Sequence, residues 1–524
     1  MDGLQAFPNE VLNLIMEQLV VAVGIRKLVR LRTVNRKFDT VIMQTICVSQ
    51  TVDIDDPATP GLASRMPPIL RGKVVAVKSR SASASSGSYL SVVASVSQAL
   101  DNLIEDSNEQ LRRSRHEAVA GTVLLVRDHP VDHKIEAQNV LSGAVIIGNL
   151  PLVASLLQNN SLTDVNGTTP YFHDLLTLAA TYGHVDVVRY LLSCGARLDS
   201  VFSSWSNQEC RLMALAKWQA QDQDMRAWSL RTYPPSALRT AVFGGHTDIV
   251  HLFLHPEHRL PITNTEYLRA ILAGAKAGRL DLIDALFETI GKKLADFPDL
   301  KSELMWAAVR HGRKHVVQKL LDSGADINVF RFPGPFPDDS ALCIAASLGN
   351  ISMVHFLIGR GANVNNNPNH QPVEGAALAG HEEVVELLLD HGADPSRALR
   401  SAAAGSQPLL IKYLLHRFPD LPFRDAGELG LLAVVRALLV KNLTAVTLLV
   451  EAGVDPNDDF YTGPHGSLWY LAQQASFGRW IGEHLITLGA RHSGEDTYYD
   501  DSNEPPTIRG VRVSERTWEW VSKY

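Results

Sequence analysis

The sequence predicts an all-α fold in which short helix pairs stack into a solenoid. One stretch between Ser340 and Ser396 holds two copies of a unit, SALCIAASLGNISMVHFLIGRGANVN and QPVEGAALAGHEEVVELLLDHGADPS. Within each copy, apolar residues at i, i+1, i+4 and i+5 mark one buried helix stripe. Glycines such as Gly349 and Gly361 suit the left-handed position that ends a helix. A helix pair this small cannot cover its own apolar face, so copies must stack.

The same template recurs along most of the chain. Its first apolar position falls at Leu152, Val187, Ile249, Leu282, Val316, Met353, Val384, Leu410, Ala445 and Ile481. The successive gaps are 35, 62, 33, 34, 37, 31, 26, 35 and 36 residues. The gap of 62 is close to two periods, so an eroded unit is expected within Leu212–Leu230. The sequence therefore predicts a solenoid of 10–11 repeats over residues 137–492.

The repeated pattern AAxxGH…VVxxLLxxGAD resembles the ankyrin repeat, with residues 376–394 near its consensus. The resemblance covers roughly Val140 to His492 and implies an ankyrin-repeat α-solenoid. The TPLH tetrapeptide that usually opens the first helix is missing almost everywhere. Ser406, Lys441 and Phe477 occupy glycine positions of the last three repeats. The register of residues 200–235 and 397–492 stays open, whereas the architecture does not depend on it.

Residues 1–46 form a different unit. Pro8 suits the first turn of a helix, and the helix that follows carries an apolar face that ends before Gly24. A second apolar series, from Ile25 to Ile42, alternates with basic residues. This pattern predicts a three-helix lobe of about 40 residues, a size that seldom sustains a core unaided. Its apolar face is therefore expected to need a partner.

The lobe resembles an F-box. The family opening LPxE is matched by residues 7–10, FPNE, and the leucine-rich segment that runs into V-x-[KR]-x-[FW] is matched by residues 28–38. The resemblance implies docking on the Skp-type adaptor of a cullin–RING ubiquitin ligase. The implied adaptor-binding residues are Phe7, Pro8, Leu12, Ile15, Leu19, Leu28, Leu31, Val34 and Phe38. An F-box followed by degenerate repeats is similar to fungal F-box/ankyrin-repeat proteins.

A second interpretation treats Met1–Ile46 as a helical cap on the first repeat, since terminal repeats need polar caps. A cap should adjoin what it covers, and almost ninety residues intervene here. The F-box interpretation is favoured for that reason.

Two further segments flank the repeats. Residues 47–136 are interpreted as a linker, because Ser79–Ser97 holds nine serines in nineteen residues. Helical spacing from Tyr89 to about Val119 predicts one bridging helix within it. Residues 493–524 form an acidic C-terminal tail.

Two long loops between repeats are the predicted substrate-binding elements, because loops on a rigid scaffold carry function. They are Val329–Asp339 and Asp458–Gly466, and their predicted contact residues are Phe332, Phe336, Phe460 and Tyr461. Aromatic anchors on proline-stiffened loops lose little entropy on binding. The alternative, that the rings fold under their own loops, has equal weight for Phe330 and Phe332. Exposure is favoured for Phe336 and Tyr461.

Net charge, cysteine content and the pattern of apolar residues argue against several classes of function and location. A net charge of −7 over 524 residues argues against a nucleic-acid-binding role. Four scattered cysteines favour a reducing compartment. The acidic start is not that of a secretory signal, and no apolar run is long enough to span a bilayer. We expect a cytoplasmic or nuclear protein without a membrane partner.

No catalytic motif is found, and neither a cofactor nor a metal site is predicted. His255 and His258 form an HxxH, but Pro256 interrupts the helix that would direct them. Turn histidines such as His184, His246 and His381 are expected to hydrogen-bond backbone rather than bind metal. The chain is therefore not expected to be an enzyme.

The favoured function is the substrate-recognition subunit of a cullin–RING ubiquitin ligase, with the F-box on the adaptor and the repeats on an unknown protein substrate. The alternative is an ankyrin-repeat interaction scaffold with no link to ubiquitin.

Overall fold

The computed structural model describes most of the repeat region and little of the N-terminal lobe. The described residues are 68–81, 87–104, 108–125, 128–159, 161–198, 236–264, 266–329, 340–365, 371–419, 428–457 and 479–490, the pairs 507–508 and 511–512, and positions 14, 15, 18 and 41. The chain divides into two compact units: Met1–Gly274 with Asp281–Gly291, and Ala275–Leu280 with Lys292–Tyr524. Each is described here by itself.

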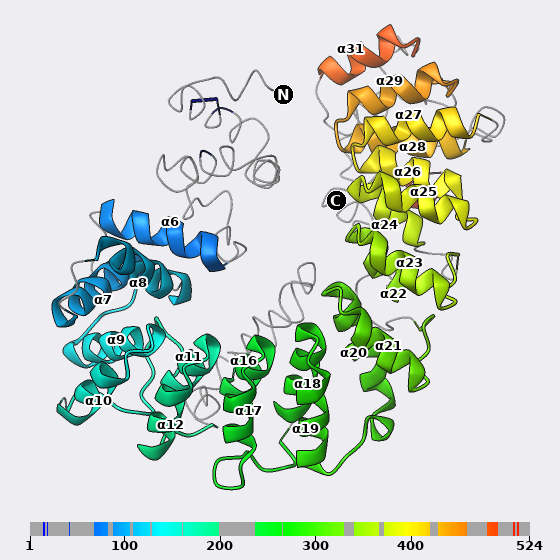
Figure 1. Cartoon of the computed structure of the whole chain (residues 1–524). Helices are drawn as coiled ribbons and strands as arrows, with labels where there is room; N and C mark the ends of the chain where they lie inside the picture. Colours follow the sequence, from blue (N-terminus) through cyan, green and yellow to red (C-terminus); the bar gives the residue numbers. More distant parts are fainter. Residues whose placement is uncertain are drawn as a thin grey trace. The chain divides into compact units, whose positions relative to one another are not determined.

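Helices arranged as antiparallel pairs account for nearly all the described residues (Figure 1). The pairs are α9 (His133–Ile146) and α10 (Leu150–Asn159), α11 (Leu175–Tyr182) and α12 (Val185–Ser193), α16 (Ala237–Gly244) and α17 (Thr247–Leu254), α18 (Glu266–Ala277) and α19 (Leu280–Ile290), α20 (Pro298–Arg310) and α21 (Lys314–Asp322), α22 (Ala341–Ser347) and α23 (Ile351–Gly359), α24 (Pro372–Ala379) and α25 (Glu382–Asp390), α26 (Pro395–Ala404) and α27 (Pro408–Arg417), and α28 (Glu428–Leu439) and α29 (Leu443–Glu451). A 3-10 turn, η2 (Leu294–Asp296), precedes α20, and α31 (Arg479–Thr487) is the second helix of a further repeat. Two short strands, β1 (Thr507–Ile508) and β2 (Val511–Arg512), pair antiparallel. The predicted helical solenoid is confirmed.

The apolar stripe that defined the template is the core of each repeat. Nine of the ten template positions are buried to 2% exposure or less; Leu152 is half-buried, and its neighbour Val153 is fully buried. Each stripe faces the preceding and following helix pairs, because a single pair has no other apolar surface to cover it. The periodicity therefore located the second helices within one residue.

One residue in left-handed conformation joins the first helix of every repeat to the second. It is Gly148, Gly183, Gly245, Gly278, Gly312, Gly349, Gly380, Ser406 or Lys441 in chain order. Ser406 and Lys441 have φ of 55° and 57°, and they are the only non-glycine residues with positive φ among those described. The prediction that both stand in glycine positions agrees with this geometry, whereas Phe477 lies outside the described residues. We call this residue the turn residue.

In the first unit, the helices on either side of the long sequence gap are direct neighbours. α11 packs on α16, and α12 packs on α17. The His246 Nε2 atom lies 3.4 Å from the Thr181 carbonyl oxygen, as expected for adjacent repeats. The eroded eleventh repeat expected within Leu212–Leu230 is therefore not stacked between them. Residues 199–235, with their three tryptophans, lie outside the described part of the chain.

In the second unit, the first helices α20, α22, α24, α26 and α28 pack on one another in sequence order. The second helices follow the same order, with α23 on α25 and α27 on α29. Figure 1 shows this unit as parallel rows of helices coloured from green to orange. Neighbouring first helices place their exposed residues side by side, and this arrangement sets up the candidate site.

Between residues 68 and 122, where the sequence predicted a linker with one bridging helix, the structure has three helices. They are α6 (Pro68–Ser81), α7 (Tyr89–Leu103) and α8 (Glu109–Thr122). α6 packs along α8, both contact α7, and α7 and α8 pack on α9. The serine-rich composition concealed α6, although Leu70, Val74 and Val75 have helical spacing and are at most 5% exposed. The single helix expected up to Val119 is interrupted because Asn108 caps a new helix.

Polar contacts hold these three helices, which we call the helical cap, together and onto the repeats. Asp101 on α7 lies 3.0 Å from Arg112 and 2.9 Å from His116, both on α8. Burial alone would raise the pKa of Asp101, but the hydrogen bonds from Arg112 and His116 outweigh it and lower that pKa. The fully buried Tyr171 hydroxyl lies 2.5 Å from the Gly87 carbonyl oxygen, which precedes α7. The first repeat is thus covered by the helical cap.

Replacing the two strained turn residues tests the left-handed geometry. A left-handed conformation costs a non-glycine residue about 1–2 kcal/mol, and replacement by glycine removes that cost. Glycine also has a larger conformational entropy in the unfolded chain, which offsets part of the gain in stability. Ser406→Gly and Lys441→Gly should therefore each raise the free energy of unfolding by up to about 1 kcal/mol. Gly380→Ser, with φ of 76° at the native residue, should lower it. Urea unfolding of the full chain measures all three, and a loss of stability in both glycine variants would contradict the assignment.

His173, just before α11, makes the stability of the first unit depend on pH. Burial, followed by the nearby charge of Arg71 on α6, lowers the pKa of His173 from 6.5 to about 4. The unfolded chain therefore takes up this proton first, and stability present above pH 6.5 is lost as the pH falls toward 4. We expect a loss of about 3 kcal/mol from this group. His173→Gln should show a smaller loss in urea titrations at pH 7 and near pH 4; an unchanged loss would refute the assignment.

Candidate protein-binding surface

Exposed apolar side chains lie at the ends of the first helices, just before the turn residue. In the first unit they are Tyr182 and Phe243, which are 38% and 44% exposed. In the second unit they are Leu348 and Leu378, both 47% exposed, on the neighbouring helices α22 and α24. These positions face away from the buried stripe, so their apolar character is not needed for stacking. Exposed apolar groups gathered on adjacent elements are typical of protein-interaction surfaces.

Tyr182 is already engaged by the helical cap. Its hydroxyl contacts the Thr122 hydroxyl at the end of α8 and lies 3.3 Å from the Ala118 carbonyl oxygen. Its ring also stacks on His184, with centroids 6.0 Å apart. The pair Leu348 and Leu378 is therefore the better candidate for contact with a partner.

The loops that follow the second helices are linked by a recurring asparagine. Asn166, Asn328, Asn365 and Asn457 each donate a side-chain hydrogen bond to the glycine carbonyl that ends the next repeat. The Asn365 Nδ2 atom, for example, lies 2.8 Å from the Gly392 oxygen. These bonds fix each loop relative to its neighbour. Loops held on a rigid scaffold can present side chains to a partner at little entropic cost.

The turn histidines hydrogen-bond backbone, as predicted. The Nε2 atoms of His184 and His381 lie 3.0 Å and 3.2 Å from the carbonyl oxygens of Ile146 and Ser347, respectively, in the preceding repeats. His255 and His258 have ring centroids 6.3 Å apart. Within the described ranges, no group of three or more histidine, cysteine or acidic residues has the arrangement of a metal site.

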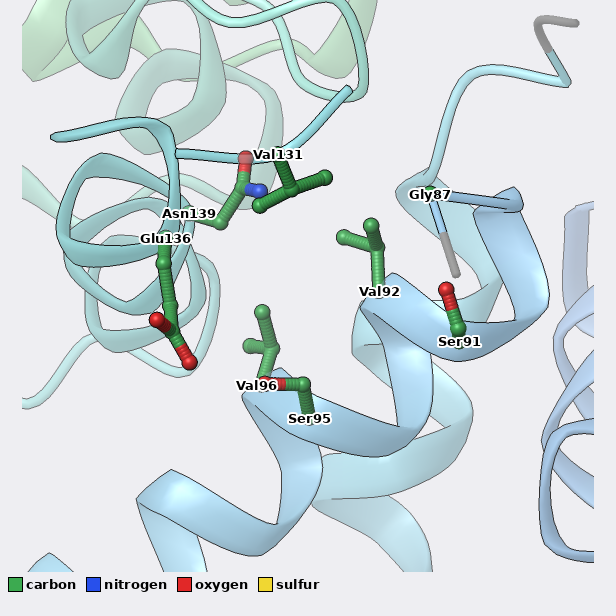
Figure 2. A pocket seen from close by; sticks show the side chains of 8 residues that line it. All are labelled: Gly87, Ser91, Val92, Ser95, Val96, Val131, Glu136 and Asn139. Atoms are coloured by element: carbon green, nitrogen blue, oxygen red, sulfur yellow. The ribbon is translucent and has the colours of Figure 1, made fainter. Parts of the chain in front are cut away.

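A hollow of about 260 Å³ lies where the helical cap meets the first repeat (Figure 2). It is lined by Gly87, Ser91, Val92, Ser95, Val96, Val131, Glu136 and Asn139. Valines from α7 face Val131, and Asn139 and the exposed Glu136 of α9 supply the polar wall. The Asn139 Oδ1 atom is buried without a hydrogen-bond partner. The lining can therefore accept a hydrogen bond from a small donor group.

Most of the sequence-predicted site residues lie outside the described part of the chain. This holds for the four loop aromatics Phe332, Phe336, Phe460 and Tyr461. It also holds for all the predicted adaptor-binding residues except Ile15, which is helical and half-buried. Nearby Leu14 is helical and 62% exposed.

Sequence reasoning missed Leu348 and Leu378. The signal that identifies them is an apolar residue one or two positions before the turn residue, outside the buried stripe. That position can be read only once the register of the repeat is known.

Comparisons with known proteins agree with the repeat geometry. A model of three ankyrin repeats matches residues 304–398, and a single-repeat model matches residues 174–201. No helix of the described part is both long and apolar enough to cross a membrane.

Two relatives share the repeats. The Ankyrin repeat and KH domain-containing protein mask-1 of Caenorhabditis elegans is 26% identical over 49% of this chain. The Ankyrin repeat, SAM and basic leucine zipper domain-containing protein 1 of Mustela putorius furo is 37% identical over 20% of it. The chain spans only 10% and 22% of the lengths of these relatives.

Among solved structures, the crystal structure of the human ASB11 ankyrin repeat domain is 21% identical, with a TM-score of 0.33. That alignment covers 49% of this chain and 98% of the ASB11 domain. The family models thus identify ankyrin repeats at residues 174–201 and 304–398, and the other described helix pairs stack in the same way. Ankyrin repeats suggest a role in protein–protein interaction.

Proposed function

We propose that this chain is the substrate-recognition subunit of a cullin–RING ubiquitin ligase. The F-box-like residues 7–38 dock on a Skp-type adaptor, and the ankyrin repeats hold a protein substrate. The observation that carries the proposal is the helical cap. Because α7 and α8 already cover α9, residues 1–46 are not needed to seal the first repeat. The proposal therefore assigns their predicted apolar face to another protein.

The described positions of the N-terminal lobe fit an amphipathic helix. Leu14 and Gln18 are one helical turn apart and both are exposed, while Ile15 is half-buried. The predicted stripe of Leu12, Ile15 and Leu19 falls on a different face from Leu14. This arrangement is consistent with an amphipathic helix, whose apolar stripe the proposal assigns to the adaptor.

In this role the chain supplies proximity rather than chemistry. Holding the substrate on the repeats and the adaptor on the F-box raises the effective concentration of substrate near the ubiquitin-charged enzyme. The proposal places the protein in the cytoplasm, the nucleus or both, where such ligases assemble.

A scaffold without a ubiquitin role is the second candidate. It is favoured by the relatives, whose names combine ankyrin repeats with KH domains or with SAM and leucine-zipper domains. Adaptor binding separates the two candidates, since a scaffold needs no Skp-type partner.

Introducing a negative charge on the predicted adaptor face tests the proposal. Leu12→Asp and Leu31→Asp in the full chain should abolish co-purification with the Skp-type adaptor, because each buries an unpaired carboxylate at an apolar contact. Leu14→Asp is the matched control, since Leu14 is 62% exposed, and it should bind normally. Circular dichroism checks that all three variants remain folded. If both Leu12→Asp and Leu31→Asp still bind the adaptor, the proposal is contradicted and the scaffold remains as the candidate function.

A second test addresses the repeats. Leu348→Asp combined with Leu378→Asp should weaken binding of a protein partner about 10-fold or more, as loss of a central apolar contact does. Both side chains are 47% exposed, so the free energy of unfolding should change by less than about 1 kcal/mol. The control is Leu409→Asp, on the second helix α27, where the native side chain is 71% exposed. Quantitative capture with the full chain reads out binding; equal capture by the double variant and the control would exclude this surface.

A further inference from the structure

Two repeats have an arginine at the same position, but only one of these arginines is paired with a carboxylate. Arg239 on α16 and Arg400 on α26 both stand six residues before their turn residues, Gly245 and Ser406. Stacked first helices bring this position against the following repeat. The environment supplied by that next repeat therefore decides what each guanidinium contacts.

Arg239 is neutralised within the chain. Its Nε atom lies 2.8 Å from the Glu266 Oε1 atom of the next repeat, and the two side chains are 5% and 0% exposed. Ser236 donates a further hydrogen bond to the same oxygen. A buried charge is tolerated in this way because it is both paired and hydrogen-bonded.

Arg400 lacks the equivalent acid. Glu266 stands twelve residues before its turn residue, and the matching position in α28, twelve before Lys441, is Leu429. The Arg400 Nε atom is buried and has no hydrogen-bond partner. Glu374 on α24, six residues before its own turn residue Gly380, lies 3.4 Å from Arg397 and accepts a hydrogen bond from the Gln371 backbone N–H.

Arg436, on the neighbouring helix α28, is a second arginine without an ion pair to a described residue. Arg436 on α28 is exposed, and no described carboxylate lies within ion-pair distance of it. Desolvation by the surrounding protein lowers the pKa of Arg436, and the charge of Arg400 lowers it further, while Glu374 raises it. Two like charges on adjacent helices repel each other, so the isolated chain maintains this pair at a cost.

We infer that Arg400 and Arg436 form a binding site for an anionic group, carboxylate or phosphate, on an acidic segment of the protein partner. Guanidinium groups match both anions with paired, charge-assisted hydrogen bonds. A partner anion would supply the acceptor that Glu266 supplies to Arg239. The inference deepens the proposed function by naming the class of substrate segment, but the adaptor takes no part in it.

Peptide binding to the full chain tests the site without the adaptor. The probes are a fluorescein-labelled 12-residue peptide rich in Asp and Glu, its Asn/Gln counterpart, and a version of the amide peptide with one phosphoserine. Fluorescence anisotropy should show the acidic or the phosphorylated probe binding at least about 10-fold more tightly than the amide probe. Which of the two binds more tightly identifies the anion. Equal affinity for all three probes would overturn the proposal.

Variants assign the effect to the two arginines. Arg400→Met with Arg436→Met should remove the preference for the anionic probe. The control is Arg417→Met, because Arg417 is paired with Asp390 on α25 and lies on a second helix. Loss of preference in the control as well would point to net charge rather than to this site, and would count against it.

Thermal stability provides an independent readout that does not depend on the probe. Because the buried Arg400 Nε atom has no hydrogen-bond partner, its removal should leave the Tm unchanged or raise it, so Arg400→Met should melt at or above the wild-type temperature. Arg239→Met, which leaves Glu266 buried without its partner, should melt lower. A lower Tm for Arg400→Met would mean that Arg400 is already paired within the chain, and would count against the proposal.

Variants of the acidic tail test whether the chain fills its own site. If the anionic probe binds only after Asp500→Asn and Asp501→Asn, the site belongs to the acidic tail, and this result would also overturn the proposal.

Discussion

Each helix pair leaves one apolar face uncovered until the next pair packs against it, and the other features of this chain depend on that constraint. Nine of the ten stripe residues are almost completely buried, and the helices that carry them pack both on their own partner helix and on neighbouring repeats. The chain must therefore reverse direction within the two or three residues that separate the paired helices, because a longer connection would shift the stripe out of register. The left-handed turn residue performs this reversal, and at Ser406 and Lys441 it does so despite the strain of a side chain. Burial of the stripes is strong enough to hold those two residues in a conformation that they disfavour.

The same constraint makes the end of the stack a problem that needs its own solution. An exposed stripe at the first repeat would be a large apolar surface, and the helical cap removes it. The cap is secured by contacts of a different kind from those within the repeats: the Asp101 cluster joins α7 to α8, and the Tyr171 hydroxyl binds the Gly87 carbonyl oxygen that precedes α7. Because the cap occupies residues 68–122 and α7 and α8 pack on α9, the apolar face predicted for residues 1–46 is not required to cover the first repeat. The proposed docking on an adaptor would give that predicted face a role.

The sequence predicted what local periodicity encodes and missed what depends on neighbours in space. The second helices follow from the spacing of apolar residues, and Lys441 was recognised in a glycine position because the ladder fixed where a glycine should stand. α6 was missed, since a serine-rich composition outweighed the spacing of Leu70, Val74 and Val75. The direct packing of α11 on α16 was not foreseen either, because a gap of 62 residues carries no information about which helices meet across it. The exposed Leu348 and the unpaired Arg400 become visible only when the positions of adjacent repeats are compared.

Repeat proteins allow this comparison because every repeat is an internal control for the others. A charged residue at one position of one helix pair can be judged against the same position elsewhere in the chain, with the same backbone geometry. Arg239 shows that the position accommodates a buried guanidinium when the next repeat supplies a carboxylate. Arg400 retains the guanidinium where Leu429 stands in place of that carboxylate, so stability alone gives no reason for an arginine there. A buried polar atom that finds no partner within its own chain, at a position where another repeat supplies one, is the reason for proposing a contact with another molecule.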